Sequence, residues 1–359
     1  MVRTAYRLAW LTAASLLAAR GISDAQAVIK VSDDVNFKLG VLGQFQADWL
    51  HDPETGDTAQ NLFIRRIRLL FGGQVATRVT FFVETDAPNL GKATPGGSNI
   101  SPAVNVQDAY AEFSFHPALA IDAGLMFVPF SRNSLQSAAS LLPIDYGAYT
   151  FTQTSATQST VGRDAGFQVK GYLVSNRLEY RVGVFQGARD AESQGAFRYA
   201  GRVQYQLLEP EATGFFYTGT YLGTKKVAAV GAAVDAQDDY HAFDGDIFVD
   251  YPAGPGAVTA QLAYNHFDGE TTFTSLPRQH TLLFEAGYFI RRWKVTPVVQ
   301  VTNRSVEGTT DGDETRWSIG ASYWWAGHNA NIKVAAGRID AAGRGPQNQF
   351  TVQLQAFYF

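Results

Sequence analysis

Apolar and polar residues alternate along most of this chain with the period of two that is typical of β-strands. The segment 60–75 is an example: its apolar face carries Phe63, Ile67, Leu69 and Phe71, and its polar face carries Arg66 and Arg68. Many segments repeat this pattern, and no helical segment lies between them to cover their apolar faces. Lipid outside a closed barrel and water inside it would suit both faces, so the pattern predicts an all-β transmembrane barrel with a wet lumen.

The alternation predicts sixteen antiparallel strands. They are expected at about 35–49, 60–75, 79–86, 104–115, 119–128, 162–173, 177–187, 196–207, 226–236, 241–251, 257–268, 278–290, 293–304, 314–325, 329–340 and 348–359. Residues 215–221 also resemble a strand. Because bacterial barrels of this type have an even number of strands, we expect residues 208–225 to form an unusually long turn instead.

The predicted connections alternate between short and long, as they do in outer-membrane barrels with short periplasmic turns and longer external loops. The short set is 76–78, 116–118, 174–176, 252–256, 291–292 and 326–328, and the long set is 50–59, 87–103, 129–161, 188–195, 269–277, 305–313 and 341–347. Only 208–225 and the short link 237–240 break the alternation. A soluble β-sandwich gives no reason for this asymmetry.

Aromatic residues near the predicted strand ends agree with a membrane barrel, since aromatic girdles lie at both membrane interfaces. The tryptophans concerned are Trp49, Trp293, Trp317, Trp324 and Trp325. The chain ends in Phe359, and a terminal aromatic residue is usual in such barrels. Phe359 does not share the face of Phe350 and Tyr358, so a register shift is expected at the end of the last strand.

The N-terminal segment has the three parts of a secretory signal peptide. Arg3 and Arg7 precede an apolar run at 8–19, and a small-residue cleavage motif follows at 25–27. The apolar run is shorter than the roughly 20 residues of a spanning helix. We therefore expect residues 1–27 to be a signal peptide, cleavage before Val28, and a mature barrel domain at 28–359.

Charge and composition exclude several classes of protein. Removal of the signal peptide changes the formal charge from −4 to −6, and this negative charge disfavours binding to the phosphates of a nucleic acid. The chain has no cysteine, so disulfides and thiolate metal sites are excluded. No part of the mature sequence has 18 consecutive apolar residues, which excludes a helical membrane protein.

Four segments in order resemble signatures of one known family. They are 63–68 (FIRRIR), 124–131 (GLMFVPFS), 162–169 (GRDAGFQV) and 180–187 (YRVGVFQG). Together they are similar to the phosphate-selective porin family, porins O and P. The resemblance covers essentially the whole mature chain.

The resemblance implies a sixteen-stranded, homotrimeric pore in the outer membrane, with a long third external loop folded into the lumen. Here that loop is 129–161, in which Ser131 to Leu142 could form a short helix. Family members specialised for phosphate use arginine ladders and a lysine cluster. This chain has eight lysines, scattered along the sequence.

Strand parity assigns charged residues to the lumen, because an arginine facing lipid near the bilayer midplane costs roughly 2–4 kcal/mol. The expected inward cations are Arg66, Arg68, Arg181, Arg198, Arg202 and Arg316, and the expected inward acids are Glu84, Asp86, Asp108, Glu112, Glu179 and Glu285. Rings of charged side chains select ions in such pores. The arginines either select small anions or only pair with the neighbouring acids, and parity does not decide between these alternatives.

No pattern nominates a catalytic, cofactor or metal site. The sequence lacks the nucleophile-elbow, zinc-protease and phosphate-loop motifs, and its six histidines are scattered without ligand spacing. We therefore expect no enzyme activity and no cofactor, and passive diffusion of small hydrophilic solutes, with weak anion preference, across an outer membrane. The alternatives are an adhesive or structural barrel whose loops bind partners, a barrel lipase, and a soluble periplasmic β-protein.

Overall fold

The computed structural model describes residues 28–94, 97–100, 103–152, 154, 156–157, 159, 161–189, 192–212 and 215–359. The expected signal peptide, residues 1–27, lies outside the described residues. Within the described part of the chain, no helix has the length and hydrophobicity needed to cross a bilayer.

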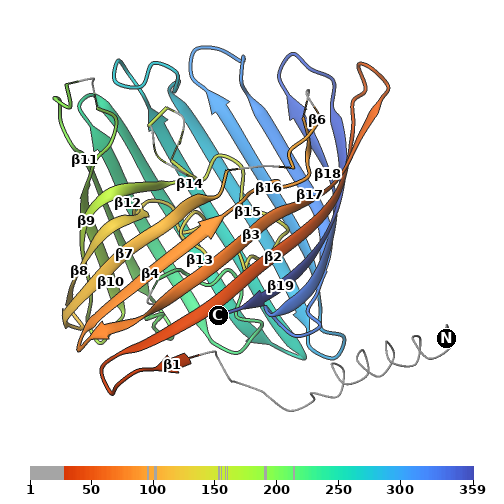
Figure 1. Ribbon diagram of the computed structural model, residues 1–359. Helices are drawn as coiled ribbons and strands as arrows, with labels where there is room; N and C mark the ends of the chain where they lie inside the picture. Colours follow the sequence, from red (N-terminus) through yellow and green to blue (C-terminus); the bar gives the residue numbers. More distant parts are fainter. Residues whose placement is uncertain are drawn as a thin grey trace, which may run out of the picture.

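Sixteen antiparallel strands form a closed barrel, as the alternation predicts (Figure 1). They are β2 (Asn36–His51), β3 (Thr58–Ala76), β4 (Val79–Asp86), β7 (Asn105–His116), β8 (Leu119–Phe127), β9 (Arg163–Leu173), β10 (Leu178–Phe185), β11 (Arg198–Gln206), β12 (Val227–Gln237), β13 (Tyr240–Ala253), β14 (Gly256–Asp268), β15 (Gln279–Ile290), β16 (Val295–Val306), β17 (Glu314–Tyr323), β18 (Ala330–Ala341) and β19 (Gln347–Tyr358). Each strand pairs with the next one along the chain, and β19 closes the ring by pairing with β2.

Three short strands are additional to the barrel wall. β1 (Val28–Lys30) pairs with the start of β2, and β5 (Ala93–Thr94) pairs with β6 (Gly97–Ser98) in a small hairpin within the connection between β4 and β7. The described residues of this segment, 208–212 and 215–225, contain no barrel strand, and the expected long turn between β11 and β12 is confirmed.

The two faces of the wall have opposite chemistry. Large apolar side chains that remain exposed in the isolated chain include Leu69, Val182, Tyr199, Ile247, Ile319 and Leu354. The alternate positions carry polar and charged side chains, among them Gln44, Arg202, Gln261 and Gln353, and these are buried inside the barrel. Since only apolar surroundings suit the outer face, the wall is built to contact lipid.

A β-bulge in β3 changes the faces that simple alternation predicts. Gln44 of β2 is opposite Arg66, whereas Phe45 is opposite Ile64, so Arg65 is an extra residue in β3. Beyond the bulge, Phe63 is opposite the inward-facing Gln46 and is buried. The prediction that Phe63 shares the lipid face of Ile67 and Leu69 is therefore wrong, because an extra residue inverts the parity of everything before it.

The C-terminal strand also differs from expectation. β19 keeps a continuous register with β2 as far as Tyr358, so no register shift occurs. Phe359 simply lies on the inner side, where its ring is 5.7 Å from that of Phe82. Trp324 is likewise turned inward and buried, and its Nε1 donates a hydrogen bond to Thr296 Oγ1 at 2.8 Å, so it is not part of an outer girdle.

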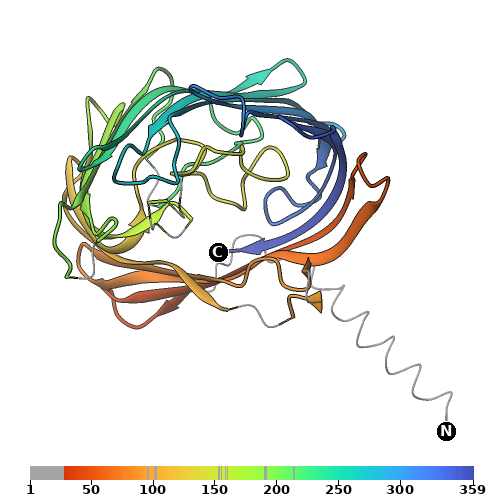
Figure 2. The same ribbon diagram turned by 90° about the horizontal axis from the view of Figure 1, so that it is seen from above.

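Two connections occupy the lumen. The view along the barrel shows the segment between β8 and β9, in yellow-green, crossing the interior (Figure 2). The turn between β11 and β12 enters from the opposite end and meets it: Tyr217 N donates to Leu135 O at 3.0 Å, and Ser137 N donates to Tyr217 O at 2.9 Å. Residues 131–142 form turns, so the predicted short helix is wrong. Backbone groups of Leu135 and Ser137 that would bond within a helix bond to Tyr217 instead.

An apolar cluster fills part of the interior where these two connections meet the wall. It includes Leu42, Leu70, Phe82, Tyr110, Met126, Val128, Ala138, Ala139, Phe185 and Ala200, with Phe215, Phe216, Phe357 and Phe359 packed against it. The alternation predicts a wet lumen but not this cluster, which makes part of the interior a packed apolar core.

Candidate functional site

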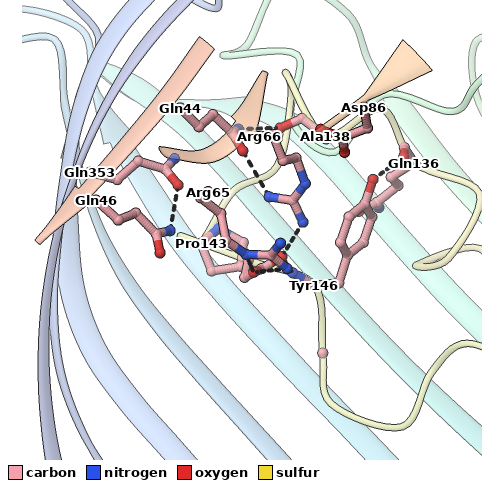
Figure 3. A network of polar contacts seen from close by, with 12 residues as sticks. Gln44, Gln46, Arg65, Arg66, Asp86, Gln136, Ala138, Pro143, Tyr146 and Gln353 are labelled. Carbon is pink, nitrogen blue, oxygen red and sulfur yellow. Dashed lines mark hydrogen bonds and ion pairs between the residues drawn. The ribbon is translucent and has the colours of Figure 1, made fainter. Parts of the chain in front are cut away.

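The inward loop is fixed to the wall by the arginine pair of the β3 bulge. Arg66 Nη2 lies 2.6 Å from Asp145 Oδ1, and Arg65 Nε lies 2.9 Å from Asp145 Oδ2. Arg66 Nη1 also donates to Gln44 Oε1 at 2.7 Å, and Gln44 Nε2 donates to Ala138 O at 3.0 Å (Figure 3). One carboxylate of the loop thus binds two adjacent guanidinium groups of the wall.

The electrostatic environment keeps Asp145 ionised. Burial opposes the charged form, but the positive charges of Arg65 and Arg66 more than offset burial and hold the pKa of the Asp145 carboxyl well below its usual range. The neighbouring Tyr146 donates its hydroxyl proton to Gln136 O at 2.7 Å, within the same loop. The loop is therefore anchored by a permanent charge as well as by neutral hydrogen bonds.

A cavity of about 600 Å³ lies between this anchored loop and the wall. The guanidinium groups that line it belong to Arg65, Arg66, Arg68, Arg163, Arg316 and Arg338. Among the described residues, the carboxylates that line it are those of Asp86 and Asp145. Gln46, Gln107 and Gln300 contribute neutral polar surface. The surface of the cavity therefore presents more positive than negative groups.

Further carboxylates pair with these arginines but are not among the residues that line the cavity. Glu84 Oε1 lies 2.7 Å from Arg68 Nη1, and Asp108 Oδ2 lies 3.0 Å from Arg163 Nη2. Arg316 pairs with Glu314, and Arg338 pairs with Asp340 at 2.7 Å. The whole cluster is close to neutral. Arg65, Arg316 and Arg338 are its more exposed arginines, with side chains that are 26%, 44% and 43% exposed.

A second group of lumen arginines is sealed from the cavity. Arg198 lies 2.5 Å from Asp235, Arg202 lies 2.6 Å from Asp246, and Arg181 lies 2.6 Å from Glu179. None of the three is among the residues that line the cavity, and all three are buried, as Arg66 and Arg163 of the cavity also are. Arg181, Arg198 and Arg202 lie beneath the inward loop and the β11–β12 turn, and they hold those segments in place: Arg202 Nη1, for example, donates to Phe130 O at 2.9 Å.

The loop and the turn are joined by a buried ion pair of their own. Arg132 of the loop makes two hydrogen bonds of 2.8 Å to Glu211 of the turn, and both side chains are fully buried. Burial would raise the pKa of Glu211, but the charge of Arg132 outweighs it and lowers the pKa below its usual value. Bidentate pairs of this kind are among the strongest charge-assisted contacts in proteins.

The structure thus divides the residues that sequence analysis assigned to the pore. It places Arg66, Arg68 and Arg316 on the cavity, with Glu84 and Asp108 as partners of its arginines. Arg181, Arg198 and Arg202 do not reach it. Glu112 lies elsewhere in the lumen, where its Oε2 is 2.6 Å from Lys170 Nζ.

Sequence analysis missed Arg65 and Arg163 as cavity residues and Arg132 as the link between the two inward segments. The dipeptide Arg65-Arg66 did contain a signal. In a regular strand one of two adjacent arginines would face lipid, at a cost of about 2–4 kcal/mol near the midplane, and a bulge avoids this cost. Arg132 lies in a loop, where no periodicity indicates the direction of a side chain.

The histidines also depart from expectation. His241, His266 and His280, far apart in the sequence, lie next to one another on the outer face of neighbouring strands. Spacing along the chain could not reveal this cluster, because antiparallel pairing brings together residues from the two ends of a hairpin.

These features define a class of protein. A sixteen-stranded barrel with an apolar outer wall, a polar inner wall and a loop folded into the lumen is an outer-membrane porin, which passes small solutes without chemical conversion. The chain belongs to the phosphate-selective porin O and P family, whose sequence model matches residues 37–306. No protein of curated function matches the sequence.

Solved structures of outer-membrane channels share the fold. The anion-selective porin of Comamonas acidovorans aligns with a TM-score of 0.60 and 12% identity, over 90% of this chain and 100% of that one. Salmonella typhi OmpF in complex with daunomycin aligns with a TM-score of 0.62 and 16% identity, over 92% and 100%. The outer membrane channel DcaP of Acinetobacter baumannii aligns with a TM-score of 0.58 and 9% identity, over 92% and 99%.

Family membership and fold together establish the general function. The protein is a non-enzymatic channel for small hydrophilic solutes in the outer membrane. The resemblance stated from the four sequence segments is confirmed, and the lipase, adhesin and soluble alternatives are not supported by the family to which the chain belongs.

Proposed function

We propose that the channel prefers small anions and that the guanidinium-lined cavity provides this preference. The observation that carries the proposal is the orientation of charge in the cavity: six arginines line it, compared with two carboxylates among the described residues. Arg65, Arg316 and Arg338 have partly exposed side chains, and their guanidinium groups can bind carboxylate or phosphate oxygens in a bidentate manner. The similarity in fold to an anion-selective porin is consistent with this preference.

The net charge of the chain would suggest the opposite preference. The negative charge of the mature protein resides partly in external loops, for example at Asp52, Asp57 and Asp311. At physiological ionic strength, charges more than about 8 Å from the ion are largely screened. The arginines that line the cavity therefore outweigh distant acids in their effect on a permeating ion.

The reversal potential across a salt gradient tests the proposal. In a tenfold gradient an ideally selective channel gives about 59 mV, and we expect the natural protein to give roughly 10–20 mV of anionic sign. The double variant Arg65→Gln, Arg66→Gln removes two cavity charges and leaves Asp145 unpaired. Its reversal potential should move to zero or to the cationic sign.

Two comparisons make the result specific. The variant Arg291→Gln, Arg292→Gln removes two exposed charges from the turn between β15 and β16 and should leave the reversal potential unchanged. The triple variant Arg181→Ala, Arg198→Ala, Arg202→Ala tests the arginines that sequence analysis favoured and that lie outside the cavity. A natural channel of cationic sign, or an equal shift in the control and the cavity variant, would contradict the proposal.

Two further properties are proposals that rest on the sequence and the family. We propose that the protein is a homotrimer, as the family resemblance implies, and that residues 1–27 are removed on export. Cross-linking of detergent-purified protein should give a limiting species of three chains, and the intact mass should correspond to a chain that starts at Val28. A monomer, or a chain that retains residues 1–27, would contradict the respective proposal.

A further inference from the structure

A cluster of histidines and carboxylates lies on the outward face of the barrel, at the end that carries the long loops. His241 is near the start of β13, His266 is near the end of β14, and His280 is near the start of β15. Glu307 directly follows β16. Register places His266 opposite both Phe243 and His280, so the cluster shares the face of the exposed Phe243 and Tyr264 and lies just beyond these aromatic residues.

The ligand atoms converge. One nitrogen each of His266 and His280 and one carboxylate oxygen of Glu307 lie within 4.8 Å of one another. A second triad, formed by His241, His266 and Asp268, has the same property and shares His266. Within the described part of the chain, three of the six histidines therefore lie in one strip across three strands.

The distance between the two imidazoles is compatible with a shared metal ion. His266 Nδ1 lies 3.2 Å from His280 Nδ1. Two nitrogen ligands of a tetrahedral zinc ion, each at 2.0–2.1 Å from the metal, would lie about 3.3 Å apart. The two imidazoles thus already have the separation of a shared coordination sphere.

The surroundings resemble the outer sphere of a metal site. His280 Nε2 lies 2.6 Å from Glu307 Oε1, so the carboxylate accepts the Nε2 proton and leaves the lone pair on Nδ1. A carboxylate on the second nitrogen of a ligating histidine is typical of such sites. Arg278 pairs with Asp268 and Glu270 and lies 3.9 Å from Glu307, so one positive charge offsets part of the charge of these three carboxylates.

We propose that His266 and His280, supported by Glu307, bind a divalent transition-metal ion on the outward face of the external rim. Imidazole nitrogens favour zinc, copper or nickel, whereas calcium and magnesium require oxygen ligands. A bound ion would connect β14 with β15 and, through Glu307, with the end of β16. The site faces away from the lumen and is independent of the anion preference.

Two hydrogen bonds to His280 Nδ1 compete with the ion. His266 Nδ1, 3.2 Å away, donates to it when His280 carries its proton on Nε2, so metal binding requires His266 to give up that Nδ1 proton. Tyr264 Oη lies 2.5 Å from His280 Nδ1, so the phenol donates a hydrogen bond to the lone pair that the metal requires. Binding must displace this hydrogen bond. A Tyr264→Phe variant removes the competitor and should bind the ion at least as tightly as the natural protein, which a purely structural role of the cluster would not produce.

Calorimetric titration of untagged, detergent-purified protein with zinc chloride tests the proposal. We expect one high-affinity ion for each chain, affinity reduced by at least about tenfold in His266→Gln and in His280→Gln, and about tenfold in Glu307→Gln. His51→Gln and His116→Gln change histidines at other places on the barrel and should bind as the natural protein does. Heat-modifiable migration on a gel verifies that each variant is folded.

Three outcomes would overturn the proposal. The first is the absence of zinc binding by the natural protein at micromolar concentration. The second is equal affinity in the natural protein and in the folded double variant His266→Gln, His280→Gln. The third is a loss of affinity in His51→Gln as large as that in His266→Gln, which would indicate nonspecific binding to surface histidines.

Discussion

The lumen contains two groups of arginines that occupy equivalent positions in the alternation of their strands and differ in what covers them. Arg66 and Arg68 line a cavity, whereas Arg198 and Arg202 lie beneath the inward loop and the β11–β12 turn. Both groups are paired with carboxylates. Strand parity therefore determines which residues face the lumen, but the two inward segments determine which of those residues a permeating ion can meet.

Removal of the inward loop would eliminate this difference and should have the largest effect. Replacing residues 129–161 by a short Gly-Ser linker uncovers Arg198 and Arg202 and widens the passage. We expect a severalfold higher single-channel conductance and weaker discrimination among solutes, measured in planar bilayers. Unchanged conductance would place the narrowest part of the channel elsewhere, for example at the β11–β12 turn.

A single substitution in the sealed group should have the next largest effect, on stability. Arg202→Ala leaves Asp244 and Asp246 buried without their cation, and loss of one partner from a buried pair costs about 3–5 kcal/mol. We expect a clear decrease in the denaturant concentration at which the heat-modifiable band is lost.

The matched control for this substitution is Arg338→Ala in the cavity. Its side chain is 43% exposed and its partner Asp340 is 38% exposed, so solvent screens the pair. A pair of this kind contributes about 0–1 kcal/mol. Equal destabilisation by both substitutions would show that the buried ion pair of Arg202 contributes no more to stability than the exposed ion pair of Arg338.

The smallest effect is expected at the residue that joins the loop to the cavity. Asp145→Asn removes one negative charge from the cavity lining, leaves Arg65 and Arg66 without their carboxylate, and should move the reversal potential further towards the anionic sign.

The natural protein should not show this change on mild acidification. The folded-state pKa of Asp145 is below its usual value, so its ion pairs are intact above about pH 4 and are lost only as the pH falls through the lowered value.

Measurement of the reversal potential at pH 7 and at pH 4 tests whether the ion pairs of Asp145 remain intact over this range. If acidification to pH 4 reproduces the effect of Asp145→Asn, then Asp145 has an ordinary carboxyl pKa and its pairing with Arg65 and Arg66 is weaker than the geometry indicates.

The barrel could be predicted from the sequence because lipid imposes a strict rule at every second residue of every strand. That rule gives sixteen strands, the short and long connections and the polar lumen. It does not apply inside the barrel, where the packing of residues 128–162 against the β11–β12 turn depends on tertiary contacts such as that between Arg132 and Glu211. The cavity and the apolar cluster therefore required the structure.

Individual errors have the same origin. The bulge at Arg65 inverts the face of Phe63, and the inward Trp324 and Phe359 pack against segments that lie distant in the sequence. The histidine cluster depends on the register of two successive hairpins, β13–β14 and β14–β15. In each case local alternation predicts the strand correctly, and a long-range contact determines where a particular side chain lies and what it contacts.

Closure of the ring between β2 and β19 has a consequence for folding kinetics. The seam pairs the first strand of the wall with the last, and Gln44 bonds Gln355 across 311 positions of the chain. Contacts of such high sequence separation slow folding, because the entropy of closing the loop is lost before the contact is gained. The inward loop bonds both to the β11–β12 turn and to residues at or beside this seam, among them Gln44, Lys333 and Gln355. We therefore expect zipping of the β2–β19 seam around these two segments to be the rate-limiting step of assembly.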